Sequence, residues 1–458
     1  MRALVRTHAF GYDGQATLAA LGEIEITHAA PDVAQVLAGV IEAHGGRARI
    51  VGQPSGRGIC LFTEALSAAP PAERHYTVLK QILPRNGAGQ RSYVLEYGDA
   101  DALADIGGAG GLCRTIRIEH PSCRAFALSL EEAAGAEANA RRIVHALLAP
   151  ENDYVLTARG GQADRPGPEL TPPATATTGQ GGVWLVTGGG RGVTADCAVE
   201  LARRTHGTFF LLGRSGLTEW PEGLPRETDL KALRGLLARN AGQPGMPKKP
   251  VEIDRYARRL LASTEIAATL DAIAQAGGHA HYLQADIGDA SEVRHAIGMA
   301  VQSAGSVTGL VHGAGVLSDG RCEALTPADF ETVFAPKVYG LETVLSCLDL
   351  SALGHVGLFS SASAVFGNTG QANYAAANAW LNNVAGHLAR ALPSAQVKSF
   401  CWGPWQGGMV DEALARMFTE RGIGLISRTE GARIFADMLL NAPADQRRFV
   451  IGDEWGAA

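Results

Sequence analysis

The sequence has little charge, no basic excess, no paired cysteines and no long apolar run. Charged residues make up 19% of its 458 residues and the formal net charge is −6, whereas nucleic-acid binding needs a basic face, so we expect no nucleic-acid partner. The seven cysteines are odd in number and form no CxxC pair, which predicts neither a disulfide framework nor a metal site. No segment is apolar enough to cross a bilayer, and the first residues lack the layout of a signal peptide. We therefore expect a soluble, cytoplasmic protein with no membrane partner.

The chain does contain enough apolar residues for a large core. Hydrophobic residues account for 46% of the sequence, which is globular usage, and 458 residues exceed a typical single core. A stretch rich in proline, threonine and glycine at residues 160–182 has no apolar period and separates two halves. We accordingly predict two domains, residues 1–175 and residues 176–458.

Short β-rich runs alternate with helix-length segments in the second half. Such alternation predicts a parallel, doubly wound sheet. The predicted strands are residues 182–187, 208–212, 280–284, 309–312, 356–360 and 397–402.

The first half alternates in the same way but is shorter. Its predicted strands are residues 22–27, 48–52, 58–63, 92–95, 114–119 and 154–159, and its predicted helices include residues 31–44 and 131–148. A glycine cluster at residues 107–111 follows an acidic, alanine-rich segment instead of a strand. We interpret it as an ordinary loop, because a phosphate-binding loop must leave a strand end and open a helix. The predicted fold class is α/β with two Rossmann-like, doubly wound halves, of which the first is truncated and non-catalytic.

A glycine-rich loop lies near the start of the second half, after a predicted strand and before a helical segment. In that context glycines let backbone amides approach a pyrophosphate. The next strand ends in Gly213, Arg214 and Ser215; a carboxylate there would bind the ribose of NAD, whereas arginine and serine suit a 2′-phosphate. We therefore predict NADPH as the cofactor, against the alternative that Arg214 is a solvated surface charge. The glycine-loop residues assigned to the cofactor are Thr187, Gly188, Gly190, Arg191, Gly192 and Val193.

Two further loops follow strand ends, which is where a doubly wound sheet binds its ligand. Asp286 and Ile287 suit the adenine amino group. The small residues of the other loop allow the nicotinamide ribose to approach closely. That loop contains His312, Gly313, Ala314 and Gly315.

A Ser–Ser pair at a strand end and a tyrosine that opens a helix mark the segment at residues 359–379. This segment resembles the ketoreductase domains of modular and iterative type I polyketide synthases, which belong to the short-chain dehydrogenase/reductase superfamily. In that family the tyrosine lies thirteen residues after the catalytic serine. Since 374 minus 361 is thirteen, the resemblance selects Ser361 over Ser360 and Ser363 as the partner of Tyr374.

The lysine of the site is displaced relative to free-standing short-chain dehydrogenases, which carry it four residues after the tyrosine. Here Asn378 stands at that position. Synthase ketoreductases instead carry the lysine thirty-seven residues before the tyrosine and an asparagine four after it, and 374 minus 337 is thirty-seven. The resemblance therefore implies a complete tetrad of Lys337, Ser361, Tyr374 and Asn378.

The roles of the tetrad follow from the charge that develops when hydride attacks a ketone. Tyr374 is expected to act as general acid and Ser361 as a second donor to the ketone oxygen. Lys337 favours the tyrosinate that forms, and Asn378 holds the lysine or a relay water. Each residue alone has a plainer interpretation: a strand-end cap, a packed aromatic or a solvated charge. The joint spacings and the glycine loop favour catalysis.

The resemblance covers nearly the whole chain. The segment at residues 401–409 is similar to the family's WGPW segment before the substrate lid, and it assigns Pro404 and Trp405 to the cofactor. Two departures resemble the ketoreductases of bacterial polyunsaturated fatty-acid synthases. Thr194 replaces the last glycine of the usual loop, which predicts wider strand–helix packing, and an insertion spans residues 217 to about 264.

The family's stereochemical markers imply one direction of substrate entry. A Leu-x-Asp element is present as Leu317 and Asp319, and Phe366 stands where a tryptophan would mark the opposite mode. With Met409, these residues are expected to guide the substrate, and the product is expected to be the D-3-hydroxyacyl chain.

We therefore predict an NADPH-dependent reductase of β-ketoacyl thioesters within a multidomain polyketide or polyunsaturated fatty-acid synthase. Its expected partners are an acyl carrier protein bearing a phosphopantetheine-linked chain and the other domains of the synthase. The chain contains no ketosynthase, acyltransferase or carrier signature, so we interpret it as a fragment of such a synthase. The alternatives are a free-standing reductase of a small ketone and an inactive scaffold domain.

Overall fold

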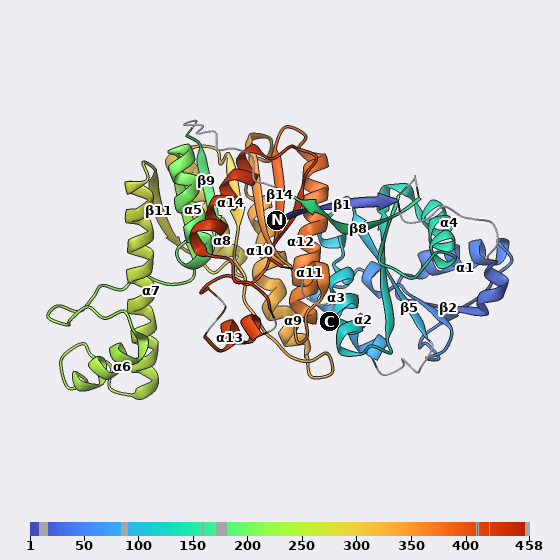
Figure 1. The fold of residues 1–458 in the computed structure, drawn as a ribbon, viewed down its shortest axis with the longest axis horizontal. Coiled ribbons are helices and arrows are strands. Elements are labelled where there is room, and N and C mark those ends of the chain that lie inside the picture. The colour runs from blue at the N-terminus through green and yellow to red at the C-terminus, as the bar shows by residue number, and fades with distance from the viewer. Residues whose placement is uncertain are drawn as a thin grey trace.

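A computed structural model describes residues 1–8, 17–83, 90–157, 160–170, 181–408, 410, 412–420 and 422–453. Its strands form one hydrogen-bonded series in the order β11-β10-β9-β12-β13-β14-β15-β1-β8-β7-β6-β5-β4-β2-β3. The first seven strands of this order come from the second half of the chain and the other eight from the first half. Figure 1 shows the two halves side by side, with β1 and β8 between them. The predicted fold class is confirmed.

The second half is a parallel, doubly wound sheet. The order of its strands reverses between β9 and β12, which both pair in parallel with their neighbours, and ligands bind at such a switch point. Its strands are β9 (Val183–Thr187), β10 (Thr208–Gly213), β11 (His279–Gln284), β12 (Gly309–His312), β13 (His355–Ser361), β14 (Gln396–Trp402) and β15 (Arg448–Ile451).

Helices cover both faces of this sheet. Leu185 belongs to one buried cluster with Trp380, whereas its neighbours in β9, Trp184 and Val186, belong to a second cluster with Phe435. Both faces of β9 are therefore buried, as expected of a parallel sheet. The helices are α5 (Gly192–Thr205), α6 (Leu230–Arg239), α7 (Pro250–Gln275), α8 (Ala290–Ala304), α9 (Pro327–Phe334), α10 (Gly340–Ser346), α11 (Ser363–Phe366), α12 (Ala372–Ala391), α13 (Glu412–Glu420) and α14 (Arg428–Asn441).

The first half has a parallel sheet with an antiparallel edge that joins it to the second half. Strand β8 pairs antiparallel with β7 and with β1, and β1 pairs antiparallel with β15. Its strands are β1 (Arg2–His8), β2 (Glu23–Thr27), β3 (Arg47–Val51), β4 (Ile59–Phe62), β5 (Arg91–Asp99), β6 (Arg124–Glu131), β7 (Tyr154–Thr157) and β8 (Gly160–Glu169). Its helices are α1 (Pro31–Ala43), α2 (Pro71–Ile82), α3 (Ala109–Glu119) and α4 (Ala136–Leu147).

Three predictions for the first half were wrong in detail. The predicted linker at residues 160–182 begins with β8, which pairs antiparallel with β7 on one side and β1 on the other; the predicted domain boundary at residue 175 lies outside the described residues. The predicted strand at residues 114–119 is the end of α3. Its alternating polar and apolar residues imitate a strand, yet Leu112, Cys113 and Ile116 are buried on one helical face. The strand β6 was missed, and the predicted helix at residues 131–148 begins only at Ala136.

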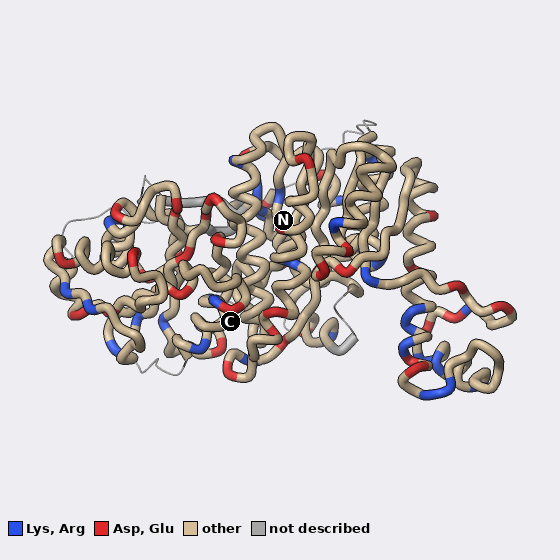
Figure 2. Tube along the Cα trace, turned by 180° about the vertical axis from the view of Figure 1, so that it is seen from behind, with Lys and Arg blue, Asp and Glu red and all other residues tan. Residues whose placement is uncertain are grey.

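The insertion at residues 217–264 forms a helical hairpin from α6 and the first part of α7. Its core is small and separate: Leu233 and Leu237 of α6 pack with Ile253 and Leu260 of α7. The hairpin projects from the body of the second half (Figure 1), and Figure 2 shows both basic and acidic residues along it. Within the described ranges no helix combines the length and apolarity that a membrane span needs.

Candidate active site

The predicted catalytic residues lie where β13 ends and α12 begins. Ser361 is the last residue of β13, Tyr374 lies in the first turn of α12, and Lys337 belongs to a π-helical turn, η6 (Ala335–Tyr339). The Nζ atom of Lys337 lies 5.3 Å from the centroid of the Tyr374 ring and donates a hydrogen bond of 3.0 Å to the carbonyl of Phe359. The exchanged lysine therefore lies beside the tyrosine.

Burial sets the protonation states of this pair. Burial raises the pKa of Tyr374 to about 12; the Asn378 side chain opposes this shift and the charge of Asp319 adds to it. Burial lowers the pKa of Lys337 to about 7. The phenol therefore keeps its proton at neutral pH, and the lysine changes charge near neutrality.

Ser361 is oriented by its neighbour Ser363. The Oγ of Ser361 accepts hydrogen bonds from the backbone amide of Ser363, at 3.2 Å, and from its hydroxyl, at 3.0 Å. The hydroxyl hydrogen of Ser361 then remains available to a substrate oxygen. Ser360 instead donates to the carbonyl of Asn378 at 3.0 Å, so the three serines differ in function. The sequence contained these serines, but the spacing argument gave no role to Ser360 or Ser363.

Asn378 presents an unused acceptor inside the site. Its Nδ2 donates to the carbonyl of Tyr374 at 2.8 Å. Its Oδ1 is buried and has no hydrogen-bond partner among the described residues. Because buried polar atoms are normally paired, this oxygen is a suitable acceptor for a relay water or for a lysine ammonium.

Thr187 and His312 form hydrogen bonds beneath the loops that the sequence assigns to the cofactor. Both are fully buried. The Nδ1 of His312 lies 2.9 Å from the Thr187 hydroxyl and its Nε2 lies 3.2 Å from the carbonyl of Lys337. Burial and then the charge of Lys337 lower the pKa of His312 to about 3, so the ring is neutral. The Thr187 hydroxyl also accepts from the amide of Ala314 at 3.3 Å.

The glycine loop leads into α5 through two glycines in left-handed backbone conformations. Gly188 and Gly192 have positive φ values of 72° and 70°, which glycine adopts without strain. A Cβ on Gly192 would have no atom within 4 Å. Arg191 is the N-cap residue of α5, but its side chain makes no capping hydrogen bond. Val193 follows in the first turn. The free amides of a helix N-terminus attract a phosphate.

The strand end after this loop carries the predicted 2′-phosphate residues. Arg214 is exposed and has no acidic partner within the described part of the chain. The carbonyl of Ser215 accepts from the Tyr282 hydroxyl at 2.7 Å, and Gly213 lies against the same tyrosine. Arg191 forms a half-exposed ion pair of 3.5 Å with Glu265 of α7.

Several loop glycines make room for neighbouring side chains. A Cβ on Gly313 would lie 2.5 Å from the Thr194 side chain, and a Cβ on Gly315 would lie 2.8 Å from Cε of Lys337. Gly313 therefore offsets the threonine that replaces the usual last glycine. Of the adenine residues, Asp286 accepts from the amide of Gly288 at 3.0 Å, whereas Ile287 is buried.

The remaining predicted site residues lie in different environments. Trp405 is buried against Trp402, at a ring distance of 4.6 Å, and the carbonyl of Pro404 accepts from the Ile426 amide, so both brace the segment before α13. Asp319 is exposed and accepts from Gln371 at 3.0 Å. Leu317 and Phe366 are half-buried, and Met409 lies outside the described residues.

The sheet, its switch point and the Lys–Ser–Tyr–Asn cluster define a Rossmann fold of the short-chain dehydrogenase/reductase type. A family model described as "KR domain" matches residues 182–407. A polyunsaturated fatty acid synthase chain from Thraustochytrium is 34% identical over 363 residues, which are 76% of this chain. Polyketide synthase GfsB from Streptomyces halstedii is 37% identical over 177 residues, which are 37% of this chain. The chain belongs to the ketoreductase (KR) domain family of these synthases.

Solved structures show the same fold over almost the whole chain. A structure of A-type ketoreductases from a modular polyketide synthase matches with a TM-score of 0.69 at 20% identity, and it covers 97% of this chain and 91% of that one. A ketoreductase domain from the bacillaene assembly line matches with a TM-score of 0.66 at 20% identity, covering 98% and 96%. The chain spans only 13% of the Thraustochytrium synthase and 3% of GfsB. KR domains typically use NADPH.

Proposed function

We propose that the protein reduces β-ketoacyl thioesters with NADPH and gives D-3-hydroxyacyl thioesters on an acyl carrier protein. The observation that carries the proposal is the Lys337 Nζ placed 5.3 Å from the Tyr374 ring, at the end of the strand that bears Ser361. We include in the proposal the division into residues 1–175, as a structural domain, and residues 176–458, as the catalytic domain.

The residues fit a nicotinamide dinucleotide phosphate. The amides at the start of α5 would hold the pyrophosphate, and among the described residues no atom beyond its chain neighbours and own helix lies within 4 Å of a Cβ built on Gly192. Arg214 and Ser215 would hold the 2′-phosphate, since a guanidinium binds such a group through charge-assisted hydrogen bonds. The unpaired Oδ1 of Asn378 also marks a site with an unused acceptor.

When bound, NADPH supplies the hydride that reduces the keto carbon. Tyr374 donates its proton to the ketone oxygen as the oxygen becomes an alkoxide, and its raised pKa keeps that proton available. Ser361 donates a second hydrogen bond to the same oxygen. Lys337, in its ammonium form, stabilises the tyrosinate, and Asn378 accepts a hydrogen bond from the lysine or from a relay water. A proton from solvent, passed through that water or the lysine, then reprotonates Tyr374.

The proposed substrate and product rest on the family and on two loop residues. The relatives are multidomain synthases, which supports a carrier-bound thioester as the substrate. Asp319 accepts a hydrogen bond of 3.0 Å from Gln371, which precedes Tyr374 by three residues, and we assign Asp319 to guiding the acyl arm. Phe366 stands where a tryptophan would mark the opposite entry.

The experiment is NADPH consumption with a β-ketoacyl N-acetylcysteamine thioester, followed by chiral chromatography of the product. We expect reduction that prefers NADPH to NADH and a product that is mainly the D epimer. No reduction of the thioester would reject the reductase proposal and favour a scaffold domain. A preference for small diffusible ketones over thioesters would favour a free-standing reductase. A mainly L product would overturn the stereochemical assignment alone.

A further inference from the structure

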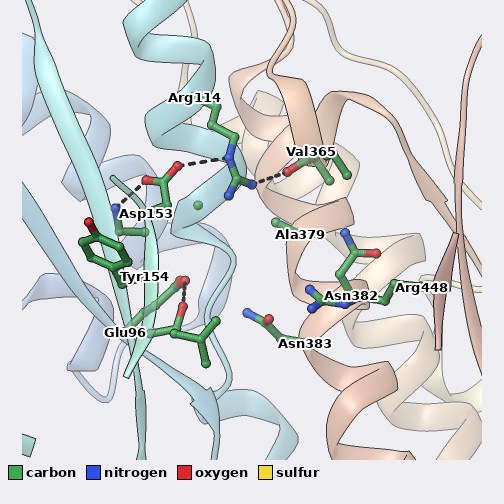
Figure 3. Close-up of a pocket in the computed structure, with 14 residues that line it drawn as sticks. Glu96, Arg114, Asp153, Tyr154, Val365, Ala379, Asn382, Asn383 and Arg448 are labelled. Carbon is green, nitrogen blue, oxygen red and sulfur yellow. Dashed lines mark hydrogen bonds and ion pairs between the residues drawn. The ribbon is translucent and has the colours of Figure 1, made fainter. Parts of the chain in front are cut away.

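Helix α3 of the first half reaches into the segment that connects Ser361 to Tyr374. Figure 3 shows Arg114 at the junction between the halves, between Asp153 and the α11 backbone near Val365. Its Nη1 donates to the carbonyl of Ala364 at 2.7 Å, and its Nε pairs with Asp153 at 3.0 Å. Although burial opposes it, the charges of Arg117 and Arg114 hold the pKa of Asp153 below its usual value, so the anchor is an ion pair.

The C-terminal end of α3 contacts two active-site loops through one carboxylate. The Oε1 of Glu119 accepts from the amide of Gly370 at 2.6 Å, and its Oε2 accepts from the amide of Cys322 at 2.9 Å. The Glu119 side chain is fully buried. Gly370 precedes Tyr374 by four residues, and Cys322 follows Asp319 by three. Glu119 therefore joins the loop of the proposed substrate guide to the loop of the proposed general acid.

The same two loops also bond directly to each other. The amide of Gly320 donates to the carbonyl of Gly370 at 2.8 Å, and Gln371 donates to Asp319 at 3.0 Å. These bonds hold only while the loops keep their register. Glu119 fixes that register, because each of its carboxylate oxygens accepts a hydrogen bond from one of the two loops.

A carboxylate is needed for this contact. Only an acidic side chain offers two acceptor oxygens in one plane, and hydrogen bonds to a charged acceptor are roughly twice as strong as neutral ones. A carboxamide would place its NH2 group, which is a donor, against one of the two backbone amides, which are also donors. One loop would therefore lose its hydrogen bond.

We infer that Glu119 is a positioning residue of the reductase, which sets the loop of Asp319 against Tyr374 and thereby controls how the substrate is presented. The inference deepens the proposed function and rests on it. It gives the first half a part in specificity, through a side chain that touches neither the cofactor loops nor the tetrad.

The test compares Glu119→Gln with Glu323→Gln and Leu37→Ala. Glu323 lies on the same loop as Cys322 but is exposed and pairs with His120 at 2.9 Å, so it controls for loss of charge. Leu37 is buried in the core of the first half, in a hydrophobic cluster that contains no residue of either loop. Leu37→Ala therefore controls for a loss of stability alone. The measurements are kcat and KM for the thioester, the ratio of product epimers, NADPH affinity by fluorescence, and hydrogen exchange of residues 319–323 and 367–371.

For Glu119→Gln we expect a fall in kcat/KM of about tenfold, a larger share of the minor epimer and faster exchange of both loops, with NADPH affinity within about twofold of wild type. Both controls should keep the wild-type epimer ratio. An unchanged kcat/KM and epimer ratio would overturn the inference even if exchange is faster. An equal loss in Leu37→Ala at a similar Tm would also overturn it. If the wild-type protein reduces no thioester, the proposed function fails. Hydrogen exchange of the two loops then tests by itself whether Glu119 positions them, and unchanged exchange in Glu119→Gln would overturn the inference.

Discussion

Each half of the protein carries a glycine cluster beside the start of a helix, and the two clusters leave room for different things. In the second half, the loop at residues 188–192 leaves β9 and opens α5, and a Cβ on Gly192 would meet no atom within 4 Å. In the first half, a Cβ on Gly108 would lie 2.1 Å from the carbonyl oxygen of Ala376, and one on Gly111 would lie 2.2 Å from that of Ala375. The second loop is open only at Gly192, since Cβ atoms on Gly188, Gly189 and Gly190 would lie 3.0, 2.5 and 2.8 Å from neighbouring atoms, whereas the first cluster is packed against the backbone of α12.

This difference shows why glycine composition alone does not define a site. The strand β5 ends at Asp99, eight positions before the cluster at residues 107–111 begins, and the prediction that this cluster binds no phosphate stays a prediction. Its interpretation as an ordinary loop was wrong, because Gly108 precedes α3 and Gly111 lies in its first turn. Ala375 and Ala376 directly follow Tyr374, so the close contact of α3 supports the turn that carries the general acid.

The largest expected effect is on this helix contact. Gly111→Ala places a methyl group against a backbone oxygen that cannot move aside, so we expect the free energy of unfolding to fall by about 3 kcal/mol. The matched control is Gly39→Ala in α1, where a Cβ would meet nothing within 4 Å; it should raise stability by about 0.5–1 kcal/mol. Denaturant unfolding measures both. Equal stability of the two variants would contradict the packing role of the first cluster.

Buried charges extend the comparison to pH. Asp153 in the first half has arginine partners, whereas Lys337 has no acidic partner among the described residues. Because the pKa of Lys337 falls from 10.5 to about 7 on folding, the unfolded chain binds one more proton than the folded chain between these pH values. This group therefore makes stability rise with pH from about 7 towards 10.5.

Lys337→Met should remove that dependence. We expect the Tm of the wild type, relative to the variant, to increase as the pH is raised from 7 to 9 in the absence of cofactor. The control is Lys248→Met in the hairpin, where the lysine is exposed; this substitution should leave the pH dependence of Tm unchanged. A Tm difference for Lys337→Met that does not change with pH would show that the lysine is not buried as described.

A smaller effect is expected at the ligand side of the second half. Arg214→Leu removes the guanidinium that we propose binds the 2′-phosphate, so the preference for NADPH over NADH should fall about tenfold. The exposed Arg239 of the hairpin is the matched control, and Arg239→Leu should leave the preference unchanged. Competition kinetics with both cofactors measure this preference. Wild-type protein that uses NADH as well as NADPH would remove the basis of this assignment.

The smallest effect is expected at the open glycine. Gly192→Ala meets no atom but forces alanine to a φ of 70°, which costs about 1 kcal/mol in the left-handed region. Stability should therefore fall less than in Gly111→Ala, while NADPH affinity falls measurably because the amides shift. If Gly192→Ala were the more destabilising of the two, the contrast between open and filled clusters would be wrong.

The sequence predicted the parts of the molecule that depend on local pattern. Six of the seven strands of the second half and the glycine loop follow from apolar runs, whereas β15 was missed. The family resemblance supplied the spacing of Lys337 and Tyr374. The sequence did not predict features that depend on contact between the halves. Nothing local shows that Glu119 binds the amides of Gly370 and Cys322, because these partners are separated by about 200 to 250 positions. The end of α3 was mistaken for a strand because its alternation of polar and apolar residues also fits a strand. Only the packing of the helix distinguishes the two.

The central claim is that Tyr374 delivers the proton during reduction of a β-ketoacyl thioester. The most direct measurement is the single-turnover rate of NADPH oxidation by Tyr374→Phe, with Tyr256→Phe in the hairpin as the control. The account predicts a loss of at least about 10²-fold for Tyr374→Phe, with NADPH affinity and Tm close to wild type, and no loss for Tyr256→Phe. A Tyr374→Phe variant that turns over at a near-normal rate would contradict it.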